Sequence, residues 1–240
     1  YISYEQGQPT HCFDADEICG KLTFEKKACD ESFETLLGSN IKLKNENCVF
    51  SLNNMIISLA GIMGGMSTCC KQNTQKVLVE CAYFNPEAII GKTSQYNLTS
   101  DAAHKFERGV DLLCQERVLR RFIEVVKDHA LIKSIKMQSF DENISHPKKV
   151  SIDVKKINKI LGTQLEKDEY LYYLSKLGFT ISNEITVPLY RHDISSQNDL
   201  AEEIARVIGY NNIKSLPFKI KEKPDKNNLR IKKIKNLLIK

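Results

Sequence analysis

The chain has 240 residues, of which 42% are hydrophobic and 27% are charged. This composition is that of a globular protein and excludes a disordered or fibrous one. The most apolar run, residues 55–63, is far shorter than the ~20 residues that a membrane-spanning helix needs, so we expect no membrane segment.

The net charge of +5 is concentrated at the C-terminal end. Residues 218–240 contain nine basic and two acidic residues, whereas the rest of the chain is close to neutral. We interpret this segment as a solvated linker or helix; the alternative is a nucleic-acid contact, since lysines neutralise phosphates. The first residue is tyrosine rather than methionine, so we expect a piece of a longer protein.

The first part of the chain is expected to contain strands followed by helices. Residues 48–52 and 55–60 are predicted to form two strands around an Asn53-Asn54 turn. Residues 77–84 are predicted to form a further strand, which is apolar on both faces and therefore expected to be buried.

Three helices are predicted after that strand. Asn85-Pro86-Glu87 is a typical helix start, with an asparagine cap and a proline in the first turn. Ser100-Asp101 begins a second helix. A long amphipathic helix is predicted for residues 111–129.

A polar break at residues 146–149 precedes the second part of the chain. Helices are predicted at 151–161 and 168–177, each ended by a glycine, followed by one or two short strands within 179–187. Asn198 is expected to cap a last helix that runs to residue 208. This order predicts a small α+β module with winged-helix character, which by itself says little about function.

All eight cysteines lie in the first half of the chain. None forms a C-x-x-C pair, and no Cys/His spacing suits zinc. Cys69 and Cys70 are adjacent, a spacing rarely found in a structural disulfide. We therefore expect reduced, mostly buried thiols and a cytosolic protein.

Glu80 is the most informative single residue. It lies inside the apolar run 77–84, where strand alternation places it on one face with Leu78 and Ala82. A carboxylate in such surroundings is costly unless it has a partner or a ligand. Two interpretations remain open: an edge-strand residue in water or an ion pair, and a polar acceptor at the base of a pocket.

Residues 61–65, Gly-Ile-Met-Gly-Gly, form a glycine-rich turn directly after a predicted strand. The chain continues with Met66-Ser67-Thr68 where a P-loop would need Gly-Lys-Ser/Thr, which excludes a Walker motif. The turn is either a tight bend or a place where a ligand approaches backbone amides. His11, a single histidine near the start, is interpreted as structural from its own surroundings in the sequence.

Four carboxylates form an acidic group in the second part: Asp193, Asp199, Glu202 and Glu203. The last three are spaced i, i+3, i+4 and share one face of the predicted helix. Clustered carboxylates suit a hard cation such as Mg²⁺. From spacing alone the simpler interpretation is favourable acidic residues at a helix N-terminus.

Several motifs together resemble one family. Gly7-Gln8-Pro9-Thr10-His11-Cys12-Phe13-Asp14, residues 59–65 and 80–86, and Lys105-Phe106-Glu107-Arg108-Gly109-Val110-Asp111 are similar to the editing region of the β subunit of bacterial-type phenylalanine–tRNA ligase. Residues 187–194 and 199–210 resemble the domain that follows editing in that subunit. The resemblance covers nearly residues 1–217, with the motifs in the expected order.

The resemblance implies an α+β fold in three parts. Residues 1–147 would form a mixed-sheet editing domain lacking its N-terminal region, and residues 148–217 a small winged-helix-like α+β domain. Residues 218–240 would be a basic linker into a catalytic-core-like domain outside this chain. The resemblance also implies a cytoplasmic (αβ)₂ enzyme in which the α subunit binds ATP and activates phenylalanine, with tRNA(Phe) as the further partner.

The resemblance further implies which residues would act. The editing site, which removes tyrosine mischarged on tRNA(Phe), would be formed by His11, Gly64, Glu80, Ser100 and Ala102. Glu80 would accept the tyrosine hydroxyl, and Ser100 stands where threonine is expected. Asp193, Asp199, Glu202 and Glu203 fall on positions assigned to one Mg²⁺ shared with the α subunit. Alternatives are an assembly and tRNA-docking module without editing, and a nucleic-acid-binding module.

Overall fold

The computed structural model describes residues 1–140, 147–215 and 226–239. The chain divides into two compact units. One takes in residues 1–152 and 178–196, and the other takes in residues 153–177 with the described residues from 197 onward. In the described ranges, no helix has the length and apolar character to cross a membrane.

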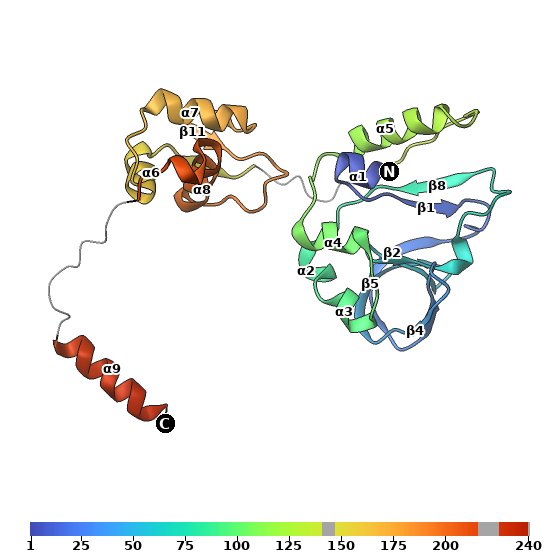
Figure 1. The fold of residues 1–240 in the computed structure, drawn as a ribbon. Helices are drawn as coiled ribbons and strands as arrows, with labels where there is room; N and C mark the ends of the chain where they lie inside the picture. Colours follow the sequence, from blue (N-terminus) through green and yellow to red (C-terminus); the bar gives the residue numbers. More distant parts are fainter. Residues whose placement is uncertain (141–146, 216–225, 240) are drawn as a thin grey trace. The chain divides into compact units, whose positions relative to one another are not determined.

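The largest sheet of the first unit has four antiparallel strands in the order β2-β5-β6-β7 (Figure 1). They are β2 (Leu22–Cys29), β5 (Asn45–Leu52), β6 (Met55–Leu59) and β7 (Met63–Gly64). The predicted turn between β5 and β6 is confirmed.

Both residues of that turn adopt positive φ, 49° at Asn53 and 71° at Asn54. Asparagine tolerates this left-handed conformation, which a two-residue hairpin turn requires.

A two-stranded antiparallel ribbon is formed by β1 (His11–Asp14) and β8 (Val77–Glu80). The predicted strand 77–84 is therefore too long, because the ladder ends at Glu80. It is also wrong that this strand is buried on both faces: Val77 is 48% and Leu78 37% exposed. The reason is that β8 has a single partner in a narrow ribbon instead of neighbours on both sides.

Smaller elements complete the strand-rich part of this unit. They are α1 (Ile2–Gln6), the hairpin β3 (Ser32–Glu34) and β4 (Asn40–Lys42), and the 3₁₀ turn η1 (Met66–Thr68). The sequence patterns predicted none of them.

Four helices follow in the chain: α2 (Pro86–Ile89), α3 (Lys92–Tyr96), α4 (Asp101–Arg108) and α5 (Gln115–Lys127). The predicted cap of α2 is confirmed, since the Asn85 side chain accepts a hydrogen bond from the Glu87 amide. The helix predicted at 111–129 starts later, because Asp111 Oδ1 accepts the Leu113 amide and forms a turn before the helix.

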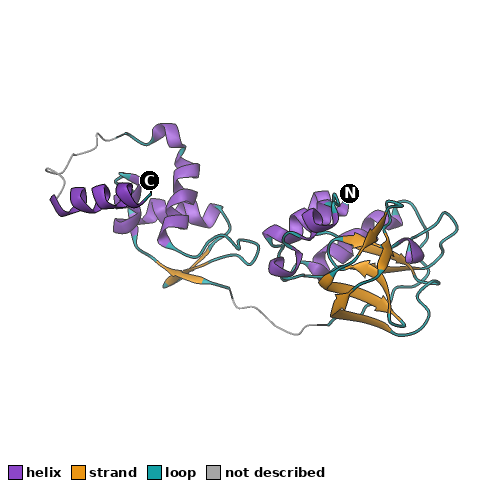
Figure 2. Cartoon of the chain, turned by 90° about the horizontal axis from the view of Figure 1, so that it is seen from below, coloured by secondary structure: helices purple, strands orange, loops and turns teal. Residues whose placement is uncertain are grey.

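The main hydrophobic core joins the helices to the sheet. Val49 and Leu59 from the sheet pack in one buried cluster with Ile89 and Phe106 from α2 and α4. Figure 2 shows helices lying beside the strands of the large sheet. This packing fixes α4 against the glycine-rich turn 61–65, which is where the candidate site lies.

A three-stranded antiparallel sheet, β10-β11-β9, also belongs to the first unit. Its strands are β9 (Lys149–Ser151), β10 (Thr180–Ile181) and β11 (Glu184–Thr186). One or two short strands were predicted within 179–187 and two are present, whereas β9 was not predicted. The α+β class is confirmed, and each strand pair in the described ranges is antiparallel.

The second unit is helical, with α6 (Val154–Leu161), α7 (Lys167–Lys176), α8 (Gln197–Ile208), the 3₁₀ turn η2 (Tyr210–Asn212) and α9 (Lys226–Leu238). α8 contacts both α6 and α7.

Three predictions for these helices need adjustment. The helix predicted from residue 151 starts at Val154, because the Asp153 side chain caps it by accepting the Lys156 amide. Asn198 lies inside α8 and is not its cap. In the basic segment 218–240, residues 226–238 are helical, while residues 218–225 lie outside the described residues.

Candidate functional site

The β1–β8 ribbon brings two predicted site residues together. His11 and Glu80 are directly opposed in the antiparallel register. Direct cross-strand partners project from the same face, with Cβ atoms about 5 Å apart. Two ionisable side chains from distant parts of the sequence thus share one small surface.

Gly64, on the edge strand β7, faces the imidazole of His11. A Cβ atom at Gly64 would lie 2.8 Å from His11 Nε2 and 2.6 Å from Leu36 Cδ1. Both distances are well inside van der Waals contact, so only glycine leaves the ring in its place. His11, Glu80 and Gly64 therefore form one site between the ribbon and the edge of the large sheet.

Burial disfavours the charged forms of both Glu80 and His11. Burial raises the pKa of the Glu80 carboxyl from 4.5 to about 7. Burial also lowers the pKa of His11 below 6.5. An ion pair between the two would move both pKa values in the opposite directions. The two side chains are therefore neighbours without being an ion pair, and this separates Glu80 from a structural salt bridge.

The Glu80 carboxyl has no hydrogen-bond donor among the residues that the structure describes. A half-buried polar group without a partner is normally avoided unless a ligand supplies one. Of the two interpretations of Glu80 left open by the sequence, the exposed edge-strand residue is excluded, because Glu80 is half-buried. Its carboxyl is available to an incoming hydroxyl group.

Ser100 serves the fold at the start of α4. Its Oγ accepts a hydrogen bond from the Ala103 amide at 3.1 Å and donates one to the Ile62 carbonyl at 2.5 Å. The first is an N-cap, and the second ties the helix to the glycine-rich turn two residues before Gly64. Ser100 thus supports the position of Gly64, with its hydroxyl already engaged.

Ala102, on the first turn of α4, is half-buried against the main core. The structure therefore unites His11, Glu80 and Gly64 directly and connects Ser100 to them through Ile62. The position of Ala102 supports α4 and its packing.

Two residues of the site were not found from the sequence. Leu36 reaches the same spot as Gly64, and its amide donates to the Gly64 carbonyl at 2.9 Å. Phe13 packs edge-on against His11 with ring centroids 4.4 Å apart. The alternation of His11 and Phe13 on one strand could have revealed Phe13. No local signal pointed to Leu36, because a non-local contact places it.

The four carboxylates of the predicted metal group are divided between the two units: Asp193 belongs to the first, and Asp199, Glu202 and Glu203 belong to the second. No group of three acidic, histidine or cysteine ligands suited to a metal occurs within residues 1–140, 147–215 and 226–239. Asp193 pairs with Arg191 at 2.6 Å, and the buried Glu203 pairs with Arg206 at 2.8 Å. An arginine thus neutralises each of these two carboxylates, and a shared Mg²⁺ at the four stays a prediction.

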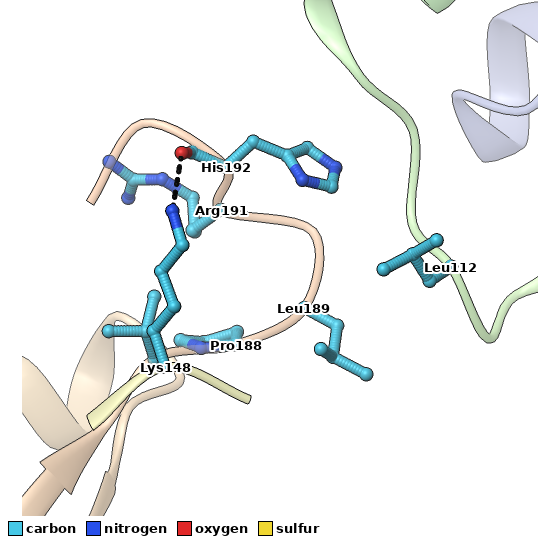
Figure 3. A pocket seen from close by; sticks show the side chains of 7 residues that line it. Leu112, Lys148, Pro188, Leu189, Arg191 and His192 are labelled. Carbon is cyan, nitrogen blue, oxygen red and sulfur yellow. Dashed lines mark hydrogen bonds between the residues drawn. The ribbon is translucent and has the colours of Figure 1, made fainter. Parts of the chain in front are cut away.

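The loop after β11 carries Arg191 and His192 beside a small pocket (Figure 3). Lys148 Nζ donates to the His192 carbonyl across this loop at 3.3 Å. The pocket has cationic side chains at its rim and is separate from the site at His11.

Comparison with known proteins identifies the family. Residues 1–131 match the B3/4 domain, and residues 150–210 match the tRNA synthetase B5 domain. The phenylalanine–tRNA ligase β subunit of Photorhabdus laumondii is 29% identical over 249 residues, covering 100% of this chain. The chain belongs to the phenylalanine–tRNA ligase β-subunit family.

Another member of this family, the β subunit of Burkholderia lata, is 33% identical over 222 residues and covers 90% of the chain. The chain spans 31% of the Photorhabdus subunit and 27% of the Burkholderia subunit. An N-terminal fragment of the β subunit from Pyrococcus horikoshii aligns with 88% of this chain and 63% of that fragment, at 15% identity. Its TM-score of 0.41 is too low to bear on the geometry of the site.

Proposed function

We propose that this part of the β subunit hydrolyses the ester of tyrosine mischarged onto tRNA(Phe). The observation that carries the proposal is the Glu80 carboxyl, which has a pKa raised to about 7, lies opposite His11 and has no donor among the described residues. The match to the B3/4 domain supports it as well.

Such a site is needed because binding alone discriminates poorly between phenylalanine and tyrosine. A hydrophobic pocket for phenylalanine cannot strongly reject an isostere that adds only a hydroxyl. A second site must therefore recognise that hydroxyl. The tyrosine hydroxyl would satisfy the Glu80 carboxyl, whereas phenylalanine would leave it unpaired at a cost of about 1–3 kcal/mol.

The reaction is a simple ester hydrolysis. The oxygen of a water molecule bonds to the ester carbonyl carbon, the bond from that carbon to the ribose oxygen breaks, and a water proton ends on the ribose oxygen. The products are free tyrosine and uncharged tRNA. Uncharged His11 would orient the ester or the attacking water through its ring nitrogens, and Gly64 would leave room for the His11 ring in that position.

The wider assignment follows the same proposal. The chain would act within an (αβ)₂ ligase whose α subunit binds ATP and activates phenylalanine, in the cytoplasm where tRNA is charged. The division into an editing domain at 1–147, a small domain at 148–217 and a linker at 218–240 belongs to this proposal too. A Mg²⁺ held by Asp193, Asp199, Glu202 and Glu203 together with the α subunit belongs to this proposal as well.

The decisive experiment measures deacylation of tyrosyl- and phenylalanyl-tRNA(Phe) by the complete ligase and its Glu80→Ala variant. We expect wild type to release tyrosine selectively and the variant to lose that selectivity by about tenfold or more. Glu25→Ala, an exposed glutamate on β2, is the matched control and should behave as wild type.

If the complete ligase releases neither amino acid, editing is the wrong assignment. The region would then be an assembly and tRNA-docking module, and the commitment of the Ser100 hydroxyl to the fold would be in keeping with that role.

A further inference from the structure

Phe24, an aromatic residue of the large sheet, is exposed on one side although it packs against other aromatic rings. Phe24, on the edge strand β2, is 55% exposed. Its ring lies against Phe50 with centroids 5.2 Å apart and against Phe84 at 5.8 Å. Phe84 is buried. Phe24 is therefore held from behind while its outer face is open to solvent.

Phe24 stands in the same row of the sheet as Gly64. Strand register pairs Phe24 with Phe50, Phe50 with Ser58, and Ser58 with Gly64. Direct partners in adjacent strands project from the same face. The open ring and the glycine beside His11 thus lie on one surface of the sheet, at its two edges.

A series of ring contacts joins the two ends of that surface. His11 contacts Phe13, Phe13 contacts Phe50 at 6.2 Å, and Phe50 contacts Phe24. Phe13 is buried, whereas Phe24 is the open ring of the series. The position of Phe24 relative to the site is therefore fixed by packed aromatic side chains.

The distance between Phe24 and Gly64 determines which part of the substrate could contact Phe24. Three inter-strand steps of about 4.8 Å place Phe24 roughly 14 Å from Gly64 along the row. An amino-acid ring that lies beside His11 at Gly64 is therefore too far away to reach Phe24 as well. The substrate carries a second flat ring on the other side of the ester, the adenine of the 3′-terminal nucleotide.

A nearby cation suits the phosphate that precedes this nucleotide. Lys26 is two residues from Phe24 on β2 and so lies on the same face. It pairs with Glu46 at 2.7 Å, with both side chains 64% exposed. Exposed ion pairs contribute little stability, so a phosphate can take the place of Glu46 at small cost.

We propose, resting on the function proposed above, that Phe24 stacks on the 3′-terminal adenine of the charged tRNA and positions its ester beside His11. Stacking depends on the flat face of the base, and an open, rigidly supported ring provides the complementary surface. Phe24 is thus a positioning residue for the nucleotide half of the substrate, whereas Glu80 reads the amino-acid half.

The test compares Phe24→Ala, Phe24→Leu and Phe24→Tyr in the complete ligase, with tyrosyl- and phenylalanyl-tRNA(Phe) as substrates. Loss of the ring in the Ala and Leu variants is expected to raise KM for deacylation about tenfold for both substrates alike. The Tyr variant keeps a flat ring and should match wild type. Tyr4→Ala removes an exposed aromatic from α1 and serves as the control.

A second arm does not depend on hydrolysis. Binding of uncharged tRNA(Phe) is compared with binding of the same tRNA lacking its terminal adenosine. The wild-type ligase should bind the shortened tRNA more weakly, and this difference should be clearly smaller for the Phe24→Ala variant. A failed editing assignment with this result intact would leave the stacking role standing.

Three outcomes would overturn the proposal. An unchanged KM in both the Ala and Leu variants excludes stacking. A change in the tyrosine-to-phenylalanine ratio, as expected for Glu80→Ala, would mean that Phe24 contacts the amino-acid ring. Weakened subunit assembly with unchanged KM would mean that a protein surface covers Phe24.

Discussion

Replacing Glu80 by glutamine should change how the stability of this region depends on pH. Burial raises the pKa of the folded-state carboxyl to about 7, above its ordinary value of 4.5. Below pH 4.5 the carboxyl is protonated in both the folded and the unfolded chain, so its burial does not reduce the stability. Between 4.5 and 7 the unfolded chain ionises first, so stability falls as pH rises, and above 7 the full penalty is present.

The size of the penalty follows from the two pKa values. Each pH unit between them corresponds to about 1.4 kcal/mol, which gives about 3 kcal/mol for the whole interval. The unfolded carboxyl is already partly ionised at pH 5, so about 2 kcal/mol is lost between pH 5 and pH 8. Glutamine has the same shape and no charge, and the Glu80→Gln variant should lack this loss.

Urea unfolding of wild type and variant at pH 5, 6, 7 and 8 measures the effect. The free energy of unfolding of the variant relative to wild type should rise by about 2 kcal/mol across the series. Glu25→Gln, on the surface of β2, controls for a general effect of charge. If the free energy of unfolding depends on pH in the same way for wild type and Glu80→Gln, the carboxyl is not desolvated. That result would contradict its proposed role as the acceptor for the tyrosine hydroxyl.

Three further predictions concern the surroundings of the site. Ser100→Ala should lower the free energy of unfolding by about 1–2 kcal/mol in urea titrations, because the helix cap and the link to the glycine-rich turn are both lost, whereas Ser100→Thr should keep both. Gly64→Ala should reduce release of tyrosine at least about tenfold in steady-state assays, since the added methyl displaces the His11 ring; an unchanged rate would show that His11 is not needed in place. In alkylation by iodoacetamide followed by mass spectrometry, exposed Cys19 should react well before Cys81, whose pKa burial raises to about 12.

Local patterns predicted those elements whose ends carry a chemical signal. The Asn53-Asn54 turn, the Asn85 cap and Gly162 after α6 each mark a place where one residue type favours one backbone conformation, and each was predicted correctly. The same reasoning failed at Asn198, because an asparagine can also lie inside a first helical turn.

Elements defined by partners were harder to predict. The short strand β1 has no distinctive sequence pattern and exists because a distant segment, β8, supplies its hydrogen bonds. The exposure of Val77 and Leu78 also depends on the number of strands beside β8, which the apolar run could not indicate.

The residues of the candidate site also differ in how far the local sequence reveals them. The unusual setting of Glu80 was visible in the sequence, because a carboxylate inside an apolar run is rare enough to need an explanation. His11, by contrast, has no local feature that separates it from a structural histidine. Its meaning depends on the register that places it opposite Glu80 and on the glycine in front of its ring.

The pairing of β1 with β8 also has a consequence for how the protein is made. The two strands are separated by the whole of the four-stranded sheet in the chain, so the ribbon closes a long loop. Closing such a loop costs entropy before any contact repays it, and contacts of this kind form late in folding. During synthesis, β1 therefore stays unpaired until the residues of β8, up to Glu80, have been added to the chain. A nascent chain halted before that point would hold a complete sheet and no site.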